Sequence, residues 1–413
     1  MNDALSFRRA LLSSILVGLG ALGPVGCGDD ASSGGSGGSG GSDGGAGGTT
    51  GTNAGGDSSV GGASAGGANA GGAGGAIGDG GAGGASGQED VERCFTTAVA
   101  CPAPADAAAV FGSCTDTAEY ITAWLSGPTE VNGQCCYQVD VTAPNNANCV
   151  AIGRPLMIDE RPQVARVGTG SVGWREARAP EVASLGPEVR EALAREWARD
   201  GAYEHASVAS FGKLALELVA FGAPSELVED AHVAALDEVR HAKTAFALTS
   251  AYGGVEVGPL ELPALRRLEL AQSLEELAAA AVLEGCYGET LAAAALYFAA
   301  ERAVDPVVRA ILRTTAAEES RHAALAYRVV KWAIREGGAP VRDAARVAAS
   351  RALAMAEAAV EGPAEGASDD NAVTASLAAH GRLSAKEQAR ENLSTARDVV
   401  RPALVVLFGG REN

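Results

Sequence analysis

The sequence predicts an all-α fold, a bundle of four long helices followed by further C-terminal helices. From about residue 181 onward the chain is rich in Ala, Leu, Val, Glu and Arg, most of which favour helices. Gly and Pro punctuate this part and leave consecutive helical patterns, each long enough to span a bundle. Aromatic residues make up only 5% of the chain, so alanine-rich helices can pack closely, and a bundle is the natural architecture.

Residues 1–27 have the composition of a targeting signal peptide. Arg8 and Arg9 precede an apolar run at residues 10–22, which is too short to span a bilayer. The segment ends in Gly-Pro-Val-Gly-Cys27, which resembles the cleavage box of a bacterial lipoprotein, although Pro24 replaces the usual Leu. This resemblance implies a lipid anchor on Cys27 and an extracytoplasmic protein held at a membrane. Cleavage without lipid, with release as a secreted or periplasmic protein, is the alternative.

Residues 28–89 are predicted to be a disordered tether. Most of the 55 glycines of the chain lie between Gly28 and Gly87, among Ala and Ser. Such a run cannot bury enough apolar surface to offset the entropy lost on ordering. The formal net charge of −19 argues against nucleic acid and anionic lipid surfaces as partners. The lipid anchor is therefore the only membrane contact that we expect.

Six of the eight cysteines cluster within residues 90–155, which we interpret as a small separate module. A clustered, even set in an exported chain predicts disulfides, here of unknown pairing. Zinc is the alternative, but the cluster contains no histidine and no paired Cys-x-x-Cys motifs. The module is expected to be rich in loops and could contact a protein partner. Its two adjacent cysteines are not expected to bond to each other. The six are Cys94, Cys101, Cys114, Cys135, Cys136 and Cys149.

Residues 156–182 are interpreted as a linker that could hold a short strand or extended segment at 164–172. The bundle, residues 183–338, is predicted to contain four helices, at about 187–220, 225–252, 262–303 and 306–336. Asp305 and Pro306 predict an N-cap and a first-turn proline for the fourth helix, which Gly337 and Gly338 should end. The C-terminal part, residues 339–413, should hold a helix at 340–360 and a last helix opened by a capping box, Ser384 to Glu387.

Two of the five histidines lie in Glu-x-x-His motifs, Glu238 to His241 and Glu319 to His322. Residues three apart share one face of a helix, so a carboxylate and an imidazole at this spacing can ligate one metal. The flanks of the two motifs also match, because both read Ala-x-acid-Glu-x-Arg-His-Ala. This internal repeat predicts two equivalent helices that face one site. Arg240 and Arg321, in the same motifs, are expected to form ion pairs on the bundle exterior.

If the repeating unit is a helix pair, each preceding helix should supply one more carboxylate. Glu204 lies 34 residues before Glu238, and Glu284 lies 35 residues before Glu319. Apolar residues follow each of them at helical spacing, and a buried carboxylate without a partner is costly, so a metal is the economical explanation. Glu276 and Glu289 are rivals on the third helix, and Glu284 is preferred because only it keeps the repeat spacing.

The six ligand candidates resemble the ligand set of ferritin-like di-iron carboxylate proteins, in the expected order. The set is Glu204, Glu238, His241, Glu284, Glu319 and His322. The resemblance implies two metal ions, most often iron with manganese as the alternative. The Asp-Glu-x-Arg-His pattern is also similar to bacterial monooxygenases, which implies that Asp237 and Glu318 orient the metal-bound histidines. Tyr287 could touch the metal pocket, although core packing is its alternative role.

The resemblance implies redox chemistry on O2, peroxide or Fe(II), with a small molecule or a metal as substrate. A ferroxidase, a peroxidase and an oxygenase all remain open. The other hypothesis is a structural or binding lipoprotein, in which the helices form a scaffold and any metal is structural. Metal content and turnover distinguish these two classes.

Overall fold

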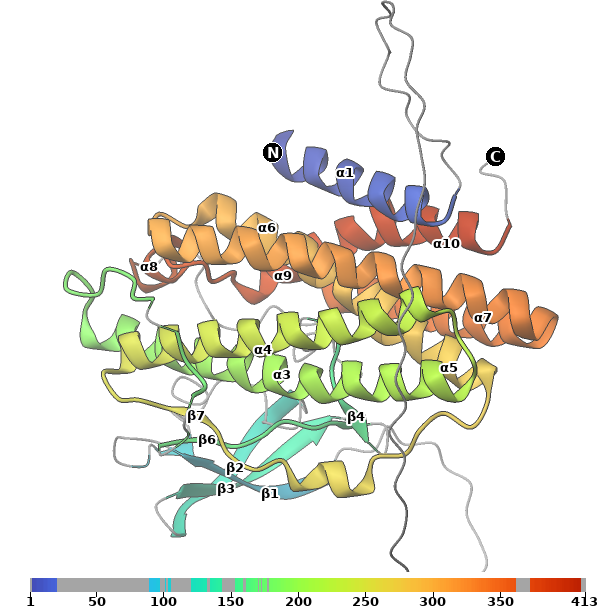
Figure 1. The fold of residues 1–413 in the computed structure, drawn as a ribbon. Helices are drawn as coiled ribbons and strands as arrows, with labels where there is room; N and C mark the ends of the chain where they lie inside the picture. Colours follow the sequence, from blue (N-terminus) through green and yellow to red (C-terminus); the bar gives the residue numbers. More distant parts are fainter. Residues whose placement is uncertain are drawn as a thin grey trace, which may run out of the picture. The chain divides into compact units, whose positions relative to one another are not determined.

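The chain is largely helical in the computed structural model, as the sequence predicts (Figure 1). The structure describes residues 2–20, 89–96, 101, 103–104, 120–131, 134–142, 153–158, 161–169, 171, 173–176, 178–361 and 372–409. The predicted tether, its anchor Cys27, and Cys114 and Cys149 lie outside these residues, as does the side chain of Cys94.

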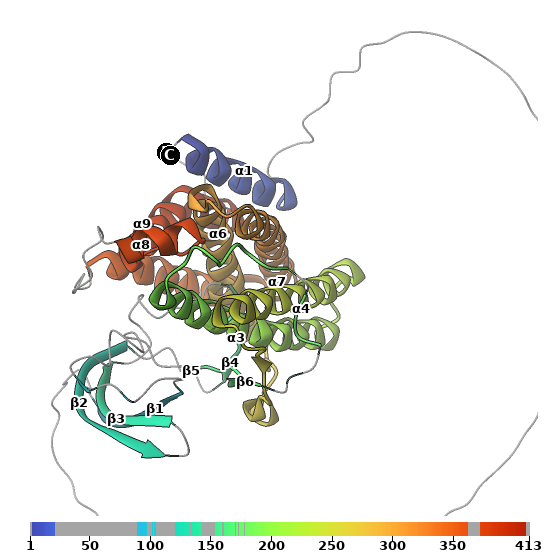
Figure 2. The same cartoon turned by 90° about the vertical axis from the view of Figure 1, so that its left-hand side faces the viewer.

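Four long helical segments pack as two pairs. Helix α3 (Pro187–Ala220) lies along α4 (Ser225–Gly253). The second pair joins a continuous segment to α7 (Pro306–Glu361). That segment consists of α5 (Leu274–Ala280), the π-helix η2 (Ala281–Glu289) and α6 (Thr290–Arg302). Figures 1 and 2 show the two pairs side by side, so residues of all four segments can meet in the interior.

The ends of these helices follow the local sequence closely. Helix α4 ends at Gly254, whose φ of 71° is a left-handed conformation that glycine adopts without strain. Asp305 opens α7, since its carboxylate accepts hydrogen bonds from the amides of Val307 and Val308, both at 2.9 Å. Gly338, with φ 69° and ψ −138°, interrupts α7 just before Pro340. The predicted division into two helices at this point is confirmed.

The third helix begins later than expected. Residues 262–303 were expected to be one helix, but Pro263–Arg267 forms only a 3₁₀ turn, η1. The long helix starts at Leu274, where Ser273 is the N-cap and accepts a hydrogen bond from the Glu276 amide at 3.2 Å. Four consecutive alanines of α6, Ala292 to Ala295, are buried. Small side chains therefore let neighbouring helices approach α6 from more than one side, as the composition suggested.

The C-terminal helices are α8 (Ala372–Ala379), α9 (Ala385–Thr395), η3 (Ala396–Val400) and α10 (Arg401–Leu407). The predicted capping box is confirmed, because Ser384 and Glu387 exchange side-chain to backbone hydrogen bonds at the start of α9. Helix α1 (Asn2–Gly18) packs on α6, α7, η3 and α10, and it buries Leu11 and Ile15. The assignment of this segment as a targeting signal stays a prediction. None of the described helices combines the length and the apolar character needed to cross a membrane.

The cysteine-rich module, expected to be rich in loops, contains a three-stranded antiparallel sheet. Its strands are β1 (Glu89–Thr96), β2 (Tyr120–Val131) and β3 (Gln134–Thr142), in the order β1-β3-β2. Cys101 and Cys135 form a disulfide, and Cys136 is disulfide-bonded as well. For these residues the disulfide prediction is confirmed over zinc, and the adjacent cysteines do not bond to each other.

Short strands form one pair within the linker and a second pair between the linker and the helical region. Strand β4 (Met157–Ile158) pairs with β5 (Arg161–Pro162). Strand β6 (Val167–Gly168), within the segment expected to be extended, pairs with β7 (Gly258–Pro259) in the connection after α4. The residues just before β4 reach the interior of the helical region, where the acidic and histidine side chains lie.

Candidate metal centre

The structure brings five of the six predicted ligands together in the interior. Helix α3 supplies Glu204, α4 supplies Glu238 and His241, and α7 supplies Glu319 and His322. The sixth member of the cluster is Glu289, the last residue of the π-helix η2. Each of the four long helical segments therefore contributes at least one side chain.

These six side chains form two groups, each able to hold one cation. The first group is Glu204, Glu238, His241 and Glu319, and the second is Glu238, Glu289, Glu319 and His322. Within each group one potential ligand atom per residue lies within 4.8 Å of the others. Glu238 and Glu319 belong to both groups. Two carboxylates shared by adjacent groups are the arrangement that would bridge two metal ions.

Glu284, which the repeat spacing favoured, lies elsewhere. Its carboxylate forms an ion pair with Arg154, with 2.9 Å between Nη2 and Oε2, and it belongs to neither group. A π-helix takes more residues per turn than an α-helix, so counting with an α-helical repeat points to the incorrect residue across Ala281–Glu289. Glu289 takes the position assigned to Glu284. The other rival, Glu276, is exposed at the start of α5 and accepts a hydrogen bond from the Gln272 amide.

Several potential ligand atoms at this site form no hydrogen bond within the part of the chain that the structure describes. Both carboxylate oxygens of Glu289, Oε2 of Glu238 and Nδ1 of His241 are buried and form no hydrogen bond of good geometry with any described residue, although charged side chains of the cluster lie close to them. Buried polar atoms are nearly always hydrogen-bonded. A cluster of unpaired oxygen and nitrogen atoms around a common point is what a cation would satisfy, so the residues fit a metal centre.

Without a metal, protons take the place of cations. Burial, reinforced by nearby carboxylates, raises the pKa of Glu204 and of Glu289 well above the usual carboxyl range. Burial opposes protonation of His322, but hydrogen bonds to Glu238 and Glu319 outweigh it and raise its pKa to about 10. The pKa of His241 is also raised, against burial, by the carboxylates of Glu204 and Glu238 among others. Metal binding should therefore displace protons.

The two histidines are oriented by acids from the opposite motif. Nε2 of His241 lies 2.8 Å from Oε2 of Glu318, and Nε2 of His322 lies 3.2 Å from Oδ2 of Asp237. A carboxylate at Nε2 favours a proton on that nitrogen. It leaves Nδ1 of each ring directed to the shared carboxylates, with 3.2 Å from His241 to Glu319 and 3.2 Å from His322 to Glu238. The acid before each motif's Glu thus serves the other motif's His.

Arg240 and Arg321 complete this outer network, which lies toward solvent. Arg321 lies 3.2 Å from Asp237 and 3.6 Å from Glu318, and Arg240 forms ion pairs with the same two acids. The arginine side chains are 49% and 59% exposed, as expected for ion pairs on the exterior. The arginines thus fix the carboxylates of Asp237 and Glu318, and these carboxylates orient the imidazoles.

We predict that Glu318→Gln and Asp237→Asn each weaken metal binding by about 10–100-fold, because the imidazoles lose their orienting carboxylates. Competition with a coloured chelator measures the affinity. Glu336→Gln, an exposed change on the same helix as Glu318, is the matched control and should bind metal like the wild type. Unchanged affinity in both variants would contradict the orienting role.

The remaining candidates lie outside the cluster. Tyr287 is buried in the apolar core, in line with its alternative role in packing, and burial raises its pKa to about 12. His205 packs edge-on against Trp174, and His380 lies 2.8 Å from the hydroxyl of Tyr252. His232 is exposed. Cys286 is a buried free thiol.

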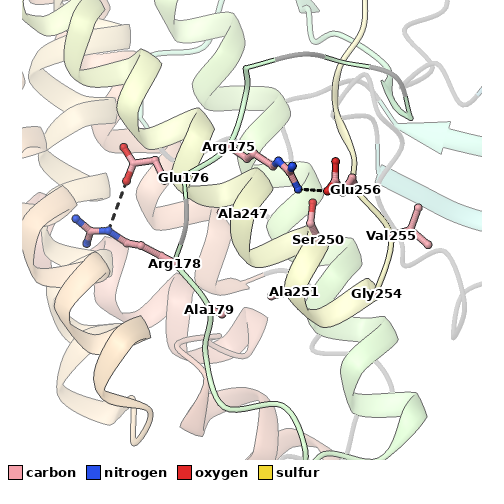
Figure 3. Close-up of a pocket in the computed structure, with 10 residues that line it drawn as sticks. All are labelled: Arg175, Glu176, Arg178, Ala179, Ala247, Ser250, Ala251, Gly254, Val255 and Glu256. Carbon is pink, nitrogen blue, oxygen red and sulfur yellow. Dashed lines mark ion pairs between the residues drawn. The ribbon is translucent and has the colours of Figure 1, made fainter.

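A separate pocket lies at the C-terminal end of α4 (Figure 3). Its charges are already paired, Arg175 with Glu256 and Arg178 with Glu176. None of its described lining residues is a histidine, and it holds no member of the ligand cluster. It is therefore distinct from the cluster of potential metal ligands.

No protein-family profile matches this chain, and no curated protein or solved structure shows significant similarity to it. The side chains of the cluster therefore carry the evidence of function.

Proposed function

We propose that this chain is a ferritin-like di-metal carboxylate protein with redox activity on O2, peroxide or Fe(II). The observation that carries the proposal is the pair of ligand groups that share Glu238 and Glu319. The ligand cluster draws on four helical segments. Two of them supply a Glu-x-x-His motif each, and the other two supply one further carboxylate each. The ligand set that the sequence resemblance implies and the cluster in the structure differ only in the replacement of Glu284 by Glu289.

The donor set favours hard or borderline divalent cations. Four carboxylates and two imidazoles offer four negative charges, which balance two divalent ions, and oxygen-rich ligation suits iron or manganese. Bound iron would supply two adjacent redox-active ions, and hence the two electrons that reduce O2 to the level of peroxide or cleave peroxide. Glu238 and Glu319 would be shared by the two ions, because they belong to both groups, and each of the other four ligands would help to hold one ion.

The protein residues would bind the ions, restrict water and handle protons. The ring of Phe211 packs edge-on against His322, with 4.9 Å between ring centroids, and keeps that side of the centre apolar. Glu204 is the most exposed of the six ligands, with 16% of its side chain accessible. Its side of the centre is where we place the entry of a small oxidant and the exchange of protons with solvent.

Mass-spectrometric metal analysis of the protein loaded with Fe(II) tests the proposal. Two ions per chain are expected in the wild type, and a Glu238→Ala, Glu319→Ala variant should bind neither, because both groups lose two ligands. Loaded wild type should then consume O2 or peroxide. No uptake, or equal uptake by the variant, rejects the di-metal reading. Uptake without turnover favours a structural or binding scaffold.

We also propose that the protein is exported and carries lipid on Cys27. Processing there would remove α1 along with the rest of the segment. Intact-mass analysis of the protein from its native membrane fraction should show a chain that begins at Cys27 and carries acyl groups. A Cys27→Ser variant should lose both the lipid and the membrane association. A mature chain that starts elsewhere, or that retains Met1, would refute the anchor.

A further inference from the structure

A short segment before β4 enters the helical region beside the metal centre. Leu156 and Ile158 are buried together with Ala206 of α3. The hydroxyl of Ser207, also on α3, donates a hydrogen bond of 2.7 Å to the backbone carbonyl of Arg154. These contacts fix the segment from Gly153 to Ile158 along the side of α3 that faces η2.

The Arg154 side chain links this segment to both neighbouring helices. Its Nη2 pairs with Oε2 of Glu284 on η2 at 2.9 Å, and its Nε donates to Oγ of Ser210 on α3 at 3.1 Å. The guanidinium lies 5.3 Å from the centroid of the Phe211 ring, and that ring contacts His322. Arg154 is only 2% exposed, and its Nη1 has no partner among the described residues.

The backbone of the segment lies directly against Glu289. A Cβ added to Gly153, which has a φ of +96°, would lie 3.7 Å from Oε2 of Glu289. A Cβ added to Gly288 would lie 2.6 Å from the carbonyl oxygen of Gly153, closer than real atoms approach. The two glycines therefore let the segment and η2 approach each other closely beside the ligand.

We infer that Arg154 and Glu284 form a buried latch that presses the segment at Gly153 against η2 and so positions Glu289 and His322 for the second metal ion. In this role they are positioning residues and do not ligate. The inference rests on the proposed di-metal function. It gives Glu284 a task beside the centre, although it is not one of the six side chains of the cluster.

Stability alone gives a weak account of this pair. Removing two charges from water is costly, and a buried ion pair is often no more stabilising than an apolar pair of similar volume. The ion pair and the Arg154–Ser210 hydrogen bond span the gap between α3 and η2, next to the one ligand that η2 supplies. Loss of the Arg154–Glu284 pair should thus lower the metal affinity of the group that contains Glu289 and His322 more than that of the other group.

Co(II) binding, followed by its visible absorption, separates the latch from a purely structural role. Wild type should bind two Co(II) ions. Arg154→Met should weaken one of them by about 10–100-fold, the range typical of residues that support a ligand, and leave the other unchanged. In a Glu289→Gln background, where that site is already impaired, Arg154→Met should have no further effect. Gly288→Ala, which disturbs the same contact sterically, should weaken the same ion.

The double variant Arg154→Met, Glu284→Gln decides between the two roles. With no charge left unpaired, its thermal stability should return toward that of the wild type, while the second Co(II) site stays weak. Recovery of stability and affinity together would overturn the latch, as would single variants that bind both ions with wild-type affinity. A wild-type chain that binds no Co(II) would reject the di-metal proposal itself, a result that differs from either of these.

Discussion

Glu289→Gln is expected to reduce the metal content from two ions per chain to one. Glu289 is the only ligand that η2 contributes, and it belongs only to the second group. An amide has no negative charge, so it cannot balance a divalent cation in a buried site. The first group keeps Glu204, Glu238, His241 and Glu319, and it should still fill. The loss should exceed the about 10–100-fold expected for a residue that only supports a ligand.

The same substitution at two other glutamates of this segment supplies the controls. Glu284→Gln should still bind two ions at saturating metal, because its carboxylate is paired with Arg154 and touches neither group. Glu276→Gln, at the exposed start of α5, should bind like the wild type. Inductively coupled plasma mass spectrometry after equilibrium dialysis against saturating metal, corrected for free metal, gives the stoichiometry. One ion in Glu284→Gln and two in Glu289→Gln would restore the assignment made from the repeat spacing.

The parts of the site that could be predicted lie on regular α-helices. Spacing alone places Glu238 with His241, and Glu319 with His322, because three residues along an α-helix return a side chain to the same face. Glu204 could be found because α3 is regular and an apolar stripe continues on its side. In each of these cases the helix keeps the regular α-helical repeat, so the spacing of residues in the sequence shows which side chains share a face.

The parts that could not be predicted depend on tertiary structure. Glu289 was named only as a rival, because the repeat spacing favoured Glu284. That spacing fails here because η2 departs from the α-helical period, and the sequence of Ala281–Glu289 contains no established signal for a π-helix. Arg154 lies in an irregular stretch at the end of the segment assigned to the cysteine-rich module, where no periodicity connects it to Glu284, which follows 130 residues later. The strands of the cysteine-rich module were missed because Gly, Pro and Asn there are typical of turns, and the β1–β3 pairing becomes visible only in the folded chain.

Removing the metal ions is expected to destabilise the protein, and increasingly so as the pH rises. Ligands that bind only the folded state stabilise it by about 3 kcal/mol at 100 times their Kd, which corresponds to roughly 5–10 °C in Tm for a domain of this size. In the metal-free protein, raised pKa values keep protons on Glu204, Glu289, His241 and His322. These protons partly offset the repulsion among the buried carboxylates.

The sign of the pH dependence follows from these shifts. A group whose pKa is raised by folding stabilises the folded state below its unfolded pKa, and this contribution is lost as the pH rises through the folded value. For His322 the loss runs from the usual 6.5 toward about 10. Glu238 and Glu319 have lowered pKa values, so their effect has the opposite sign, but it falls at acidic pH, below the usual carboxyl value. Between pH 6.5 and 9 the metal-free Tm should therefore fall.

Metal ions are not lost by deprotonation, so the Tm of the loaded protein should change less over this range and the difference between the two forms should widen. Calorimetry of loaded and chelator-treated protein at several pH values measures this. The Glu238→Ala, Glu319→Ala variant is the control, since it should show no difference between loaded and treated samples at any pH. A constant difference across the range would mean that the four groups do not hold protons in the absence of metal. The electrostatic account of the cluster would then have to be abandoned, even if the metal ions bind as proposed.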